Sequence, residues 1–99
     1  CPTAVIAANN LMVLGTMRAL KEMNLKVPDD ISLAGFDDFE WTDLFQPRLT
    51  TISQPCDEIG KQAVELLIRR IKEPEAVVQK ISFQPRLITR ESCKKIKAI

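Results

Sequence analysis

The chain has 99 residues, of which 45% are hydrophobic and 27% are charged, and its formal net charge is +1. These values are ordinary for a soluble globular domain, and they give no concentrated basic surface of the kind that nucleic-acid-binding domains need. No apolar run approaches the length of a membrane span. The chain contains no histidine, so neither a Ser-His-Asp nucleophile nor a histidine-ligated metal site can be built from it.

The cysteine pattern also limits the possibilities. Cys1, Cys56 and Cys93 are odd in number and have no CxxC spacing, which argues against a zinc site or a disulfide framework. A reducing, cytoplasmic compartment is the simpler interpretation, and we expect no metal and no cofactor. Because the sequence opens with Cys1-Pro2 and has neither an initiator Met nor a signal peptide, we expect a fragment of a longer protein.

The first expected element is a strand over residues 3–8, a continuous small apolar run typical of a strand buried on both faces. Asn9 or Asn10 is a good N-cap for a helix that follows. This helix should end near Met23, because the residue before Pro28 is pushed out of the helical region.

This helix carries more large apolar residues than one sheet-facing stripe requires. Leu14 and Met17, next to Arg18, would lie on a second side of the helix. We expect that side to be buried against a neighbouring element of the same protomer or against a second copy of the chain.

Strands and helices continue to alternate along the rest of the chain. We expect a turn at residues 28–30, strands at 31–36 and 49–53, an irregular or short helical segment at 39–47, a helix that begins at Pro55 and ends before Pro74, and strands at 77–83 and 87–89. This order predicts an α/β fold with a parallel, doubly wound sheet.

The first three expected strands all end at polar side chains, namely Asn9, Asp37 and Gln54. In parallel α/β sheets, ligands bind outside the carboxyl ends of the strands, so these residues could surround a small polar molecule such as a polyol or a base. Each also has a structural alternative. Asn9 could act only as a helix cap, Asp37 could cap a turn, and Gln54 could be a solvated linker residue.

Other conspicuous residues have simpler interpretations. Asp38, Glu40 and Asp43 form an acidic cluster with Asp37, which we interpret as a solvated loop. We expect Trp41 to pack against other side chains rather than against a ligand.

Four strings of residues, in order, resemble the C-terminal portion of the lactose-repressor/galactose-repressor (LacI/GalR) family of transcriptional regulators. They are PTAVIAANNLMVLGTMRALKEMNLKVPDDISLAGFDD, LTTISQP, EIGKQAVELLI and PRLITRES, which together run from Pro2 to about Ser92. The resemblance implies a periplasmic-binding-protein-like fold with two lobes and a ligand cleft. It also implies a small-molecule effector, usually a sugar, a nucleobase or a related metabolite, that changes the affinity for operator DNA.

The family's ligand contacts fall on Asn9, Asp37 and Gln54, and a pocket-wall position two residues beyond the Gln falls on Cys56. Nothing next to Cys56 in sequence would make it a reactive thiol. Asn10 stands where many relatives have Asp, a departure that should alter helix capping more than ligand choice.

The resemblance also implies a division into lobes. Residues 1–54 and 85–99 would belong to the C-terminal lobe and residues 55–84 to the N-terminal lobe, with the DNA-binding headpiece absent. The family dimerises through the first helix and the segment after the GFDD string. The matching positions are Leu14, Met17, Arg18 and Phe45.

These features favour the effector-sensing and dimerisation segment of a cytoplasmic repressor, which would reach operator DNA only through its headpiece and would have no membrane contact. The alternative is a periplasmic sugar-binding protein of a transport system. An enzyme with Asp37 and Asp38 as an acid/base pair is disfavoured, because adjacent side chains usually point in different directions and glycoside hydrolysis needs two acids that flank one bond. We therefore expect no catalytic residue.

Overall fold

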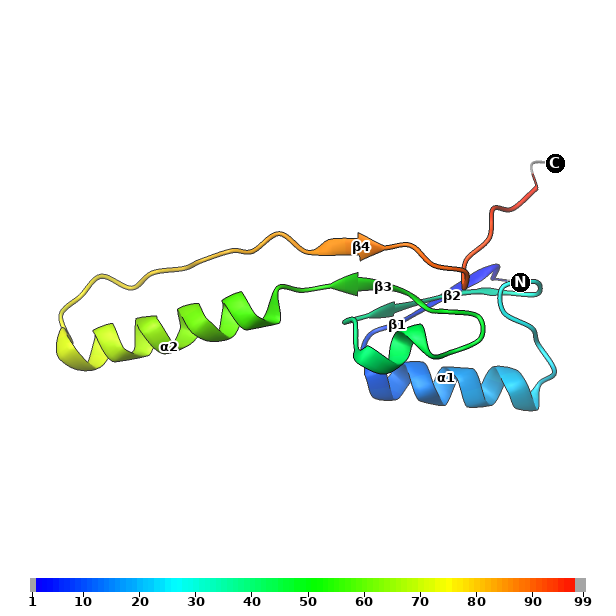
Figure 1. Ribbon diagram of the computed structural model, residues 1–99, viewed down its shortest axis with the longest axis horizontal. Helices are drawn as coiled ribbons and strands as arrows, with labels where there is room; N and C mark the ends of the chain where they lie inside the picture. The colour runs from blue at the N-terminus through cyan, green and yellow to red at the C-terminus, as the bar shows by residue number, and fades with distance from the viewer. Residues whose placement is uncertain (1, 98–99) are drawn as a thin grey trace. The chain divides into compact units, whose positions relative to one another are not determined.

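The computed structural model describes residues 2–97, and the chain divides into two compact units, Cys1–Ser53 with Arg86–Ile99 and Gln54–Pro85. Cys1 and the last two residues of the range expected in the C-terminal lobe lie outside the described residues. Figure 1 shows the elements in chain order: β1 (Ala4–Ala7), α1 (Asn10–Glu22), β2 (Ser32–Phe36), the 3-10 helix η1 (Glu40–Asp43), β3 (Thr50–Ser53), α2 (Cys56–Lys72) and β4 (Arg86–Ile88).

Within residues 2–97 the strands form a four-stranded sheet in the order β1-β2-β3-β4. β1 and β2 are parallel, β2 and β3 are parallel, and β4 runs antiparallel to β3. The predicted α/β class with a parallel sheet is confirmed, and the antiparallel strand is an addition to it. Its direction follows from the chain path, because β3 leads out of the first unit at Ser53 and β4 leads back into it at Arg86.

The core of the first unit lies between α1 and one face of the sheet (Figure 1). Its buried members are Ala7, Val13, Leu33 and Leu49. Gly35 lies opposite α1, where an added Cβ would be 3.0 Å from Cγ2 of Val13 and 3.3 Å from Cδ2 of Leu49. The absence of a side chain at Gly35 therefore allows the helix to approach the sheet closely.

The expectation that β1 is buried on both faces is wrong. Ala7 is buried, but Ile6 is 77% exposed, and Leu87 of β4 is 68% exposed. Side chains alternate between the two faces of a sheet, and in the described part of the chain a helix covers only the face that carries Ala7. The small apolar residues of β1 are typical of a strand that is covered on both faces. The described residues cover only one of them.

The ends of α1 follow from two asparagines. Asn9 is the N-cap, as predicted, and its Oδ1 accepts a hydrogen bond of 2.9 Å from the backbone N–H of Met12. Asn24 has φ 57°, in the left-handed region, and Leu25 donates its backbone N–H to the carbonyl of Leu20. This geometry is a common helix terminus, and it ends α1 at Glu22 as the sequence predicts to within about two residues.

The second unit contains α2, which begins immediately after Pro55 as predicted. The strand predicted at residues 77–83 is wrong, because the described chain has no regular secondary structure there. Val77 and Val78 are 86% and 75% exposed. A β-branched sequence becomes a strand only when another backbone pairs with it, and residues 54–85 offer no such partner. The last strand is confirmed and begins at Arg86.

We predict that Gly35→Ala destabilises the protein by about 1–3 kcal/mol, because the new methyl group would crowd Val13 and Leu49. The matched control is Gly15→Ala in α1, where a Cβ would meet nothing within 4 Å. That change should stabilise the protein by about 0.5–1 kcal/mol, because alanine favours the helix. Urea unfolding measures both free energies, and a neutral Gly35→Ala would contradict the packing described here.

Candidate ligand-binding site

The site begins where the parallel strands end. Ala7 of β1 pairs with Gly35 of β2, so both strands finish at the same edge of the sheet. Asn9 follows β1 by two residues and Asp37 follows β2 by one. The structure thus brings these two predicted residues to one edge. Oδ1 of Asn9 accepts the capping hydrogen bond of α1, and the amide nitrogen of this exposed side chain is a donor group outside that cap.

The backbone of Asp37 is unusual. Its φ is 77°, in the left-handed region, which aspartate tolerates better than most residues that carry a side chain. Its N–H donates a 2.9 Å hydrogen bond to the carbonyl of Ile52 in β3. This conformation ends the pairing of β2 with β3 and sets the direction in which the Asp37 side chain leaves the sheet.

Gln54 and Cys56 belong to the second unit. Gln54 follows β3 by one residue, and its carbonyl accepts a 2.8 Å hydrogen bond from the N–H of Cys56, the first residue of α2. Cys56 is an exposed free thiol. Their convergence with Asn9 and Asp37 on one ligand stays a prediction.

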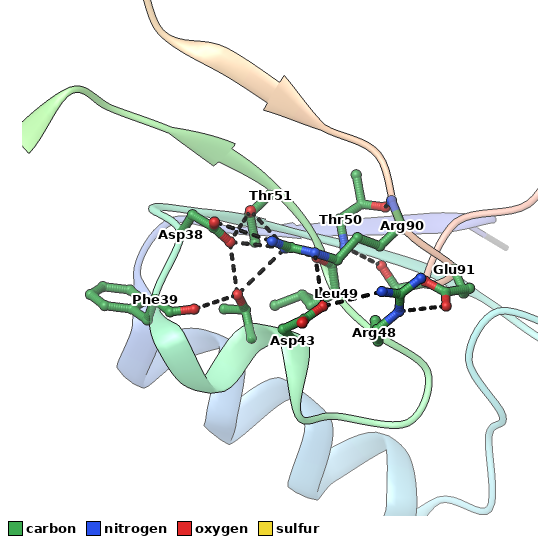
Figure 2. A network of polar contacts seen from close by, with 11 residues as sticks. Asp38, Phe39, Asp43, Arg48, Leu49, Thr50, Thr51, Arg90 and Glu91 are labelled. Atoms are coloured by element: carbon green, nitrogen blue, oxygen red, sulfur yellow. Dashed lines mark hydrogen bonds and ion pairs between the residues drawn. The ribbon is translucent and has the colours of Figure 1, made fainter.

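The interpretation of Asp38 as part of a solvated acidic cluster is wrong. Figure 2 shows its carboxylate against the guanidinium of Arg90, where Nη1 is 2.9 Å from Oδ1 and Nη2 is 3.1 Å from Oδ2. Oδ1 also accepts hydrogen bonds from the hydroxyls of Thr42, at 2.7 Å, and Thr51, at 2.8 Å. The side chains of Arg90 and Asp38 are only 13% and 24% exposed, so this two-point ion pair is largely shielded from water.

The hydrogen bond from Arg90 is the main reason that the pKa of Asp38 falls from 3.8 to about 2, with Thr42 and Thr51 adding to it and burial opposing it. Asp38 is therefore ionised at neutral pH, and both of its oxygens are bound by other side chains. A general acid must carry a proton near the operating pH. This geometry argues against Asp37 and Asp38 acting as an acid/base pair.

The segment after β4 is held by the same part of the molecule. Arg90 donates from Nη1 to the carbonyl of Leu49 at 2.6 Å and from its backbone N–H to the hydroxyl of Thr50 at 2.9 Å. The buried Ser92 accepts from the N–H of Thr50 at 2.8 Å and donates to the carbonyl of Leu33. No local signal in the sequence indicates these roles of Arg90 and Ser92, although both residues lie in the PRLITRES string.

The rest of the acidic cluster agrees better with its prediction. Glu40 is exposed, and Asp43, 58% exposed, forms a 3.4 Å ion pair with Arg48 at the surface. Surface pairs of this kind contribute little to stability.

The prediction that Trp41 packs against side chains is confirmed. Its ring stacks on Phe39 at 5.4 Å between centroids and meets the edge of Phe45 at 5.0 Å. Such aromatic pairs add to the free energy of burial and help to hold the loop that contains η1.

The four residues predicted at a dimer interface also lie together. Leu14, Met17, Arg18 and Phe45 line one groove of about 540 Å³ between α1 and the loop after η1. Gln46 and Pro47 close one side of it. Met17 and Phe45 also pack against the core of the first unit, so this side of α1 is partly buried within the chain, and its burial against a second copy stays a prediction.

The described chain lacks two features that would point to other functions. Among residues 2–97, no group of three acidic or cysteine side chains lies close enough to hold a metal ion. In the same residues, no helix has both the length and the apolar character needed to cross a membrane.

Comparison with known proteins agrees with this geometry. The periplasmic binding protein-like domain matches residues 1–93. The HTH-type transcriptional repressor PurR of Vibrio campbellii is 45% identical over 95 residues, which are 96% of this chain and 28% of the relative. The chain thus spans less than a third of the length of this curated relative.

Two solved structures have the same fold. A LacI family transcriptional regulator from Enterococcus faecalis V583, with bound ribose, superimposes with a TM-score of 0.89 at 33% identity and covers 96% of this chain and 36% of its own. The Lac repressor bound to ONPG gives a TM-score of 0.79 at 37% identity, over 92% of this chain and 27% of its own.

The sheet, its polar carboxyl edge and these matches define a periplasmic-binding-protein-like domain. The chain belongs to the LacI/GalR family of transcriptional regulators.

We predict that acid removes part of the stability through Asp38. Because the pKa of Asp38 is lowered on folding, its ionised form stabilises the native state above about pH 4, and this contribution disappears as the pH falls toward about 2. The loss should be at most about 2 kcal/mol. Asp38→Asn should flatten the decline of the unfolding free energy over this range, as measured by urea unfolding.

The control for that measurement is Glu40→Gln, which alters an exposed carboxylate of the same loop that is not bonded to Asp38 or Arg90. This variant should keep the wild-type decline. Identical pH profiles for wild type and Asp38→Asn would contradict the assignment.

Proposed function

We propose that this chain is the effector-sensing and dimerisation part of a LacI-type transcriptional regulator that controls operator DNA binding. The observation that carries the proposal is the arrival of Asn9 and Asp37 at the carboxyl edge of one parallel sheet, which is where α/β folds bind small molecules. The effector is a small polar molecule, such as a sugar, a nucleobase or a related metabolite. Family relatives that hold ribose and ONPG support this class of ligand.

Each proposed ligand contact has a chemical role. The Asp37 carboxylate accepts hydrogen bonds from neighbouring hydroxyl or N–H groups of the effector, and the charge strengthens those bonds. The amide nitrogen of Asn9 donates to an effector oxygen. Gln54 and Cys56 are proposed as further effector contacts on the strength of the family resemblance.

We also propose that the two units correspond to parts of two lobes. Residues 1–54 and 85–99 form part of the C-terminal lobe, and residues 55–84 form part of the N-terminal lobe. The division of the chain at Gln54 and Pro85 supports this assignment. Effector-dependent changes would reach operator DNA through a separate headpiece.

The groove beside α1 is proposed to hold a second copy of the chain. Its apolar residues Leu14, Met17 and Phe45 suit the buried centre of an interface, and Arg18 suits its rim. A homodimer would present two headpieces to the operator.

A solute-binding protein of a transport system is the alternative from the same fold. The family relatives are transcriptional repressors, which favours the regulator. We further propose that the protein acts in the cytoplasm and is not an enzyme. The locked, ionised state of Asp38 supports the latter, because Asp38 cannot serve as a general acid near neutral pH.

We predict that Asp37→Asn weakens effector binding by roughly 1.5–3 kcal/mol, the contribution expected of hydrogen bonds to a charged group. Asparagine tolerates the left-handed backbone at this position, so the change removes charge with little effect on shape. Calorimetric titration of the regulator that carries this chain, with ribose, cellobiose and a purine base in turn, measures the affinity.

Glu40→Gln is the matched control, because this carboxylate lies exposed on the same loop, and it should bind the effector like wild type. Unchanged affinity in Asp37→Asn would overturn the assignment of Asp37. Failure of wild type to bind any of the three compounds would count against this class of effector.

The dimer surface gives a separate prediction. Leu14→Glu should raise the dissociation constant of the dimer by at least about tenfold, because the substitution buries a charge in an apolar groove. Leu11→Glu is the control, since Leu11 lies on the same helix but outside the groove and is 73% exposed. Sedimentation velocity distinguishes dimer from monomer. A Leu14→Glu protein that remains dimeric would contradict the proposed interface.

A further inference from the structure

We propose that Asp38, held by Arg90, is a positioning residue for Asp37: it fixes the left-handed backbone of Asp37 and so the direction of the effector-binding carboxylate. This inference rests on the proposed function of Asp37. It assigns the two adjacent acids different tasks, because Asp37 meets the ligand while Asp38 meets only the protein.

The conformation of Asp37 needs an external restraint. A φ of 77° still costs free energy for a residue with a Cβ, although aspartate tolerates it better than most, and the surrounding structure must favour it for one orientation of the side chain to persist. On its N-terminal side, the hydrogen bond from the Asp37 N–H to Ile52 provides one restraint. A second restraint is needed on the C-terminal side, where the chain turns away from the sheet.

Asp38 provides that second restraint. Its carboxylate is bound by donors from three separate segments: Thr51 in β3, Thr42 in η1, and Arg90 after β4 (Figure 2). The peptide between Asp37 and Asp38 is therefore held from both ends. A rotation of Asp37 out of the left-handed region would move the Asp38 side chain away from these partners.

Arg90 is itself fixed, which makes the restraint rigid. Its Nη1 donates to the carbonyl of Leu49, and its backbone N–H donates to the hydroxyl of Thr50. Its Nε lies 3.7 Å from Oδ1 of Asp43. These contacts do not involve Asp38, so Arg90 keeps partners when Asp38 is removed. We therefore expect loss of the Asp38 carboxylate to loosen the turn at Asp37 more than it disrupts the fold.

The first experiment measures effector affinity by calorimetry in the regulator, with the ribose, cellobiose or purine base that binds wild type best. Asp38→Ala should weaken binding at least tenfold. Asp38→Asn should weaken it less, because one carbonyl oxygen still accepts hydrogen bonds. Glu40→Ala, the matched control at an exposed acid of the same loop that is not bonded to Asp38 or Arg90, should stay within twofold of wild type.

A double-mutant cycle separates positioning from a general structural effect. If Asp38 acts through Asp37, then Asp38→Ala should change affinity by less than threefold once Asp37→Asn is present. The same tenfold loss in both backgrounds would overturn the proposal, because Asp38 would then act independently of Asp37.

A second readout does not depend on the ligand. Hydrogen exchange of the Asp37 amide, which is bonded to Ile52, should accelerate at least tenfold in Asp38→Ala and remain at the wild-type rate in Glu40→Ala. If Asp38→Ala does not fold, the same measurement on Asp38→Asn decides, with a smaller acceleration expected. Unchanged exchange in a folded variant would overturn the proposal. If wild type binds none of the three compounds, the proposed class of effector is wrong. The hydrogen-exchange measurement then still tests whether Asp38 restrains the backbone of Asp37.

Discussion

The ion pair between Arg90 and Asp38 holds together the part of the molecule that carries the proposed effector contact Asp37. The end of β2, the helix η1, the strand β3 and the segment after β4 all contribute a group to this cluster (Figure 2). Neither the loop after β2 nor the return segment after β4 is part of the sheet. Side-chain hydrogen bonds therefore add to the few backbone hydrogen bonds that hold these segments, such as the one from Leu33 to Ser92. Ser92 extends the same arrangement to β2 through the carbonyl of Leu33.

This arrangement explains how two adjacent carboxylates can differ in use. Shielded from water, Asp38 gains a strong partner and becomes a fixed part of the scaffold. The neighbouring Asp37 takes its direction from a strained backbone at the end of β2. A site that recognises a polar effector needs its polar groups held in place before the ligand arrives. Asn9 meets the same need differently, since the cap of α1 fixes its side chain.

Local signals in the sequence were sufficient to predict most of the helices and strands. They also predicted that Asn9 and Asp37 lie at the carboxyl edge of the sheet. Asn9 caps α1 and Pro55 precedes α2 as predicted, because a helix start depends on residues only a few positions away in the sequence. The errors concern partners that are distant or absent. Residues 77–83 have the composition of a strand, but the described chain offers them no backbone to pair with. Ile6 lies in an apolar run typical of a buried strand, but no helix of the described chain covers its side of the sheet. Asp38 looked like a surface acid because its partner lies 52 positions later in the chain.

The coupling between Asp38 and Arg90 is the quantity that tests this account most directly. A thermodynamic cycle of Asp38→Ala, Arg90→Ala and the double variant, measured by urea unfolding at neutral pH, isolates it from the other contacts of each residue. The account predicts a favourable coupling of at least about 1.5 kcal/mol, as for hydrogen bonds between charged groups in a shielded site. Strictly additive effects, with a coupling near zero, would contradict it.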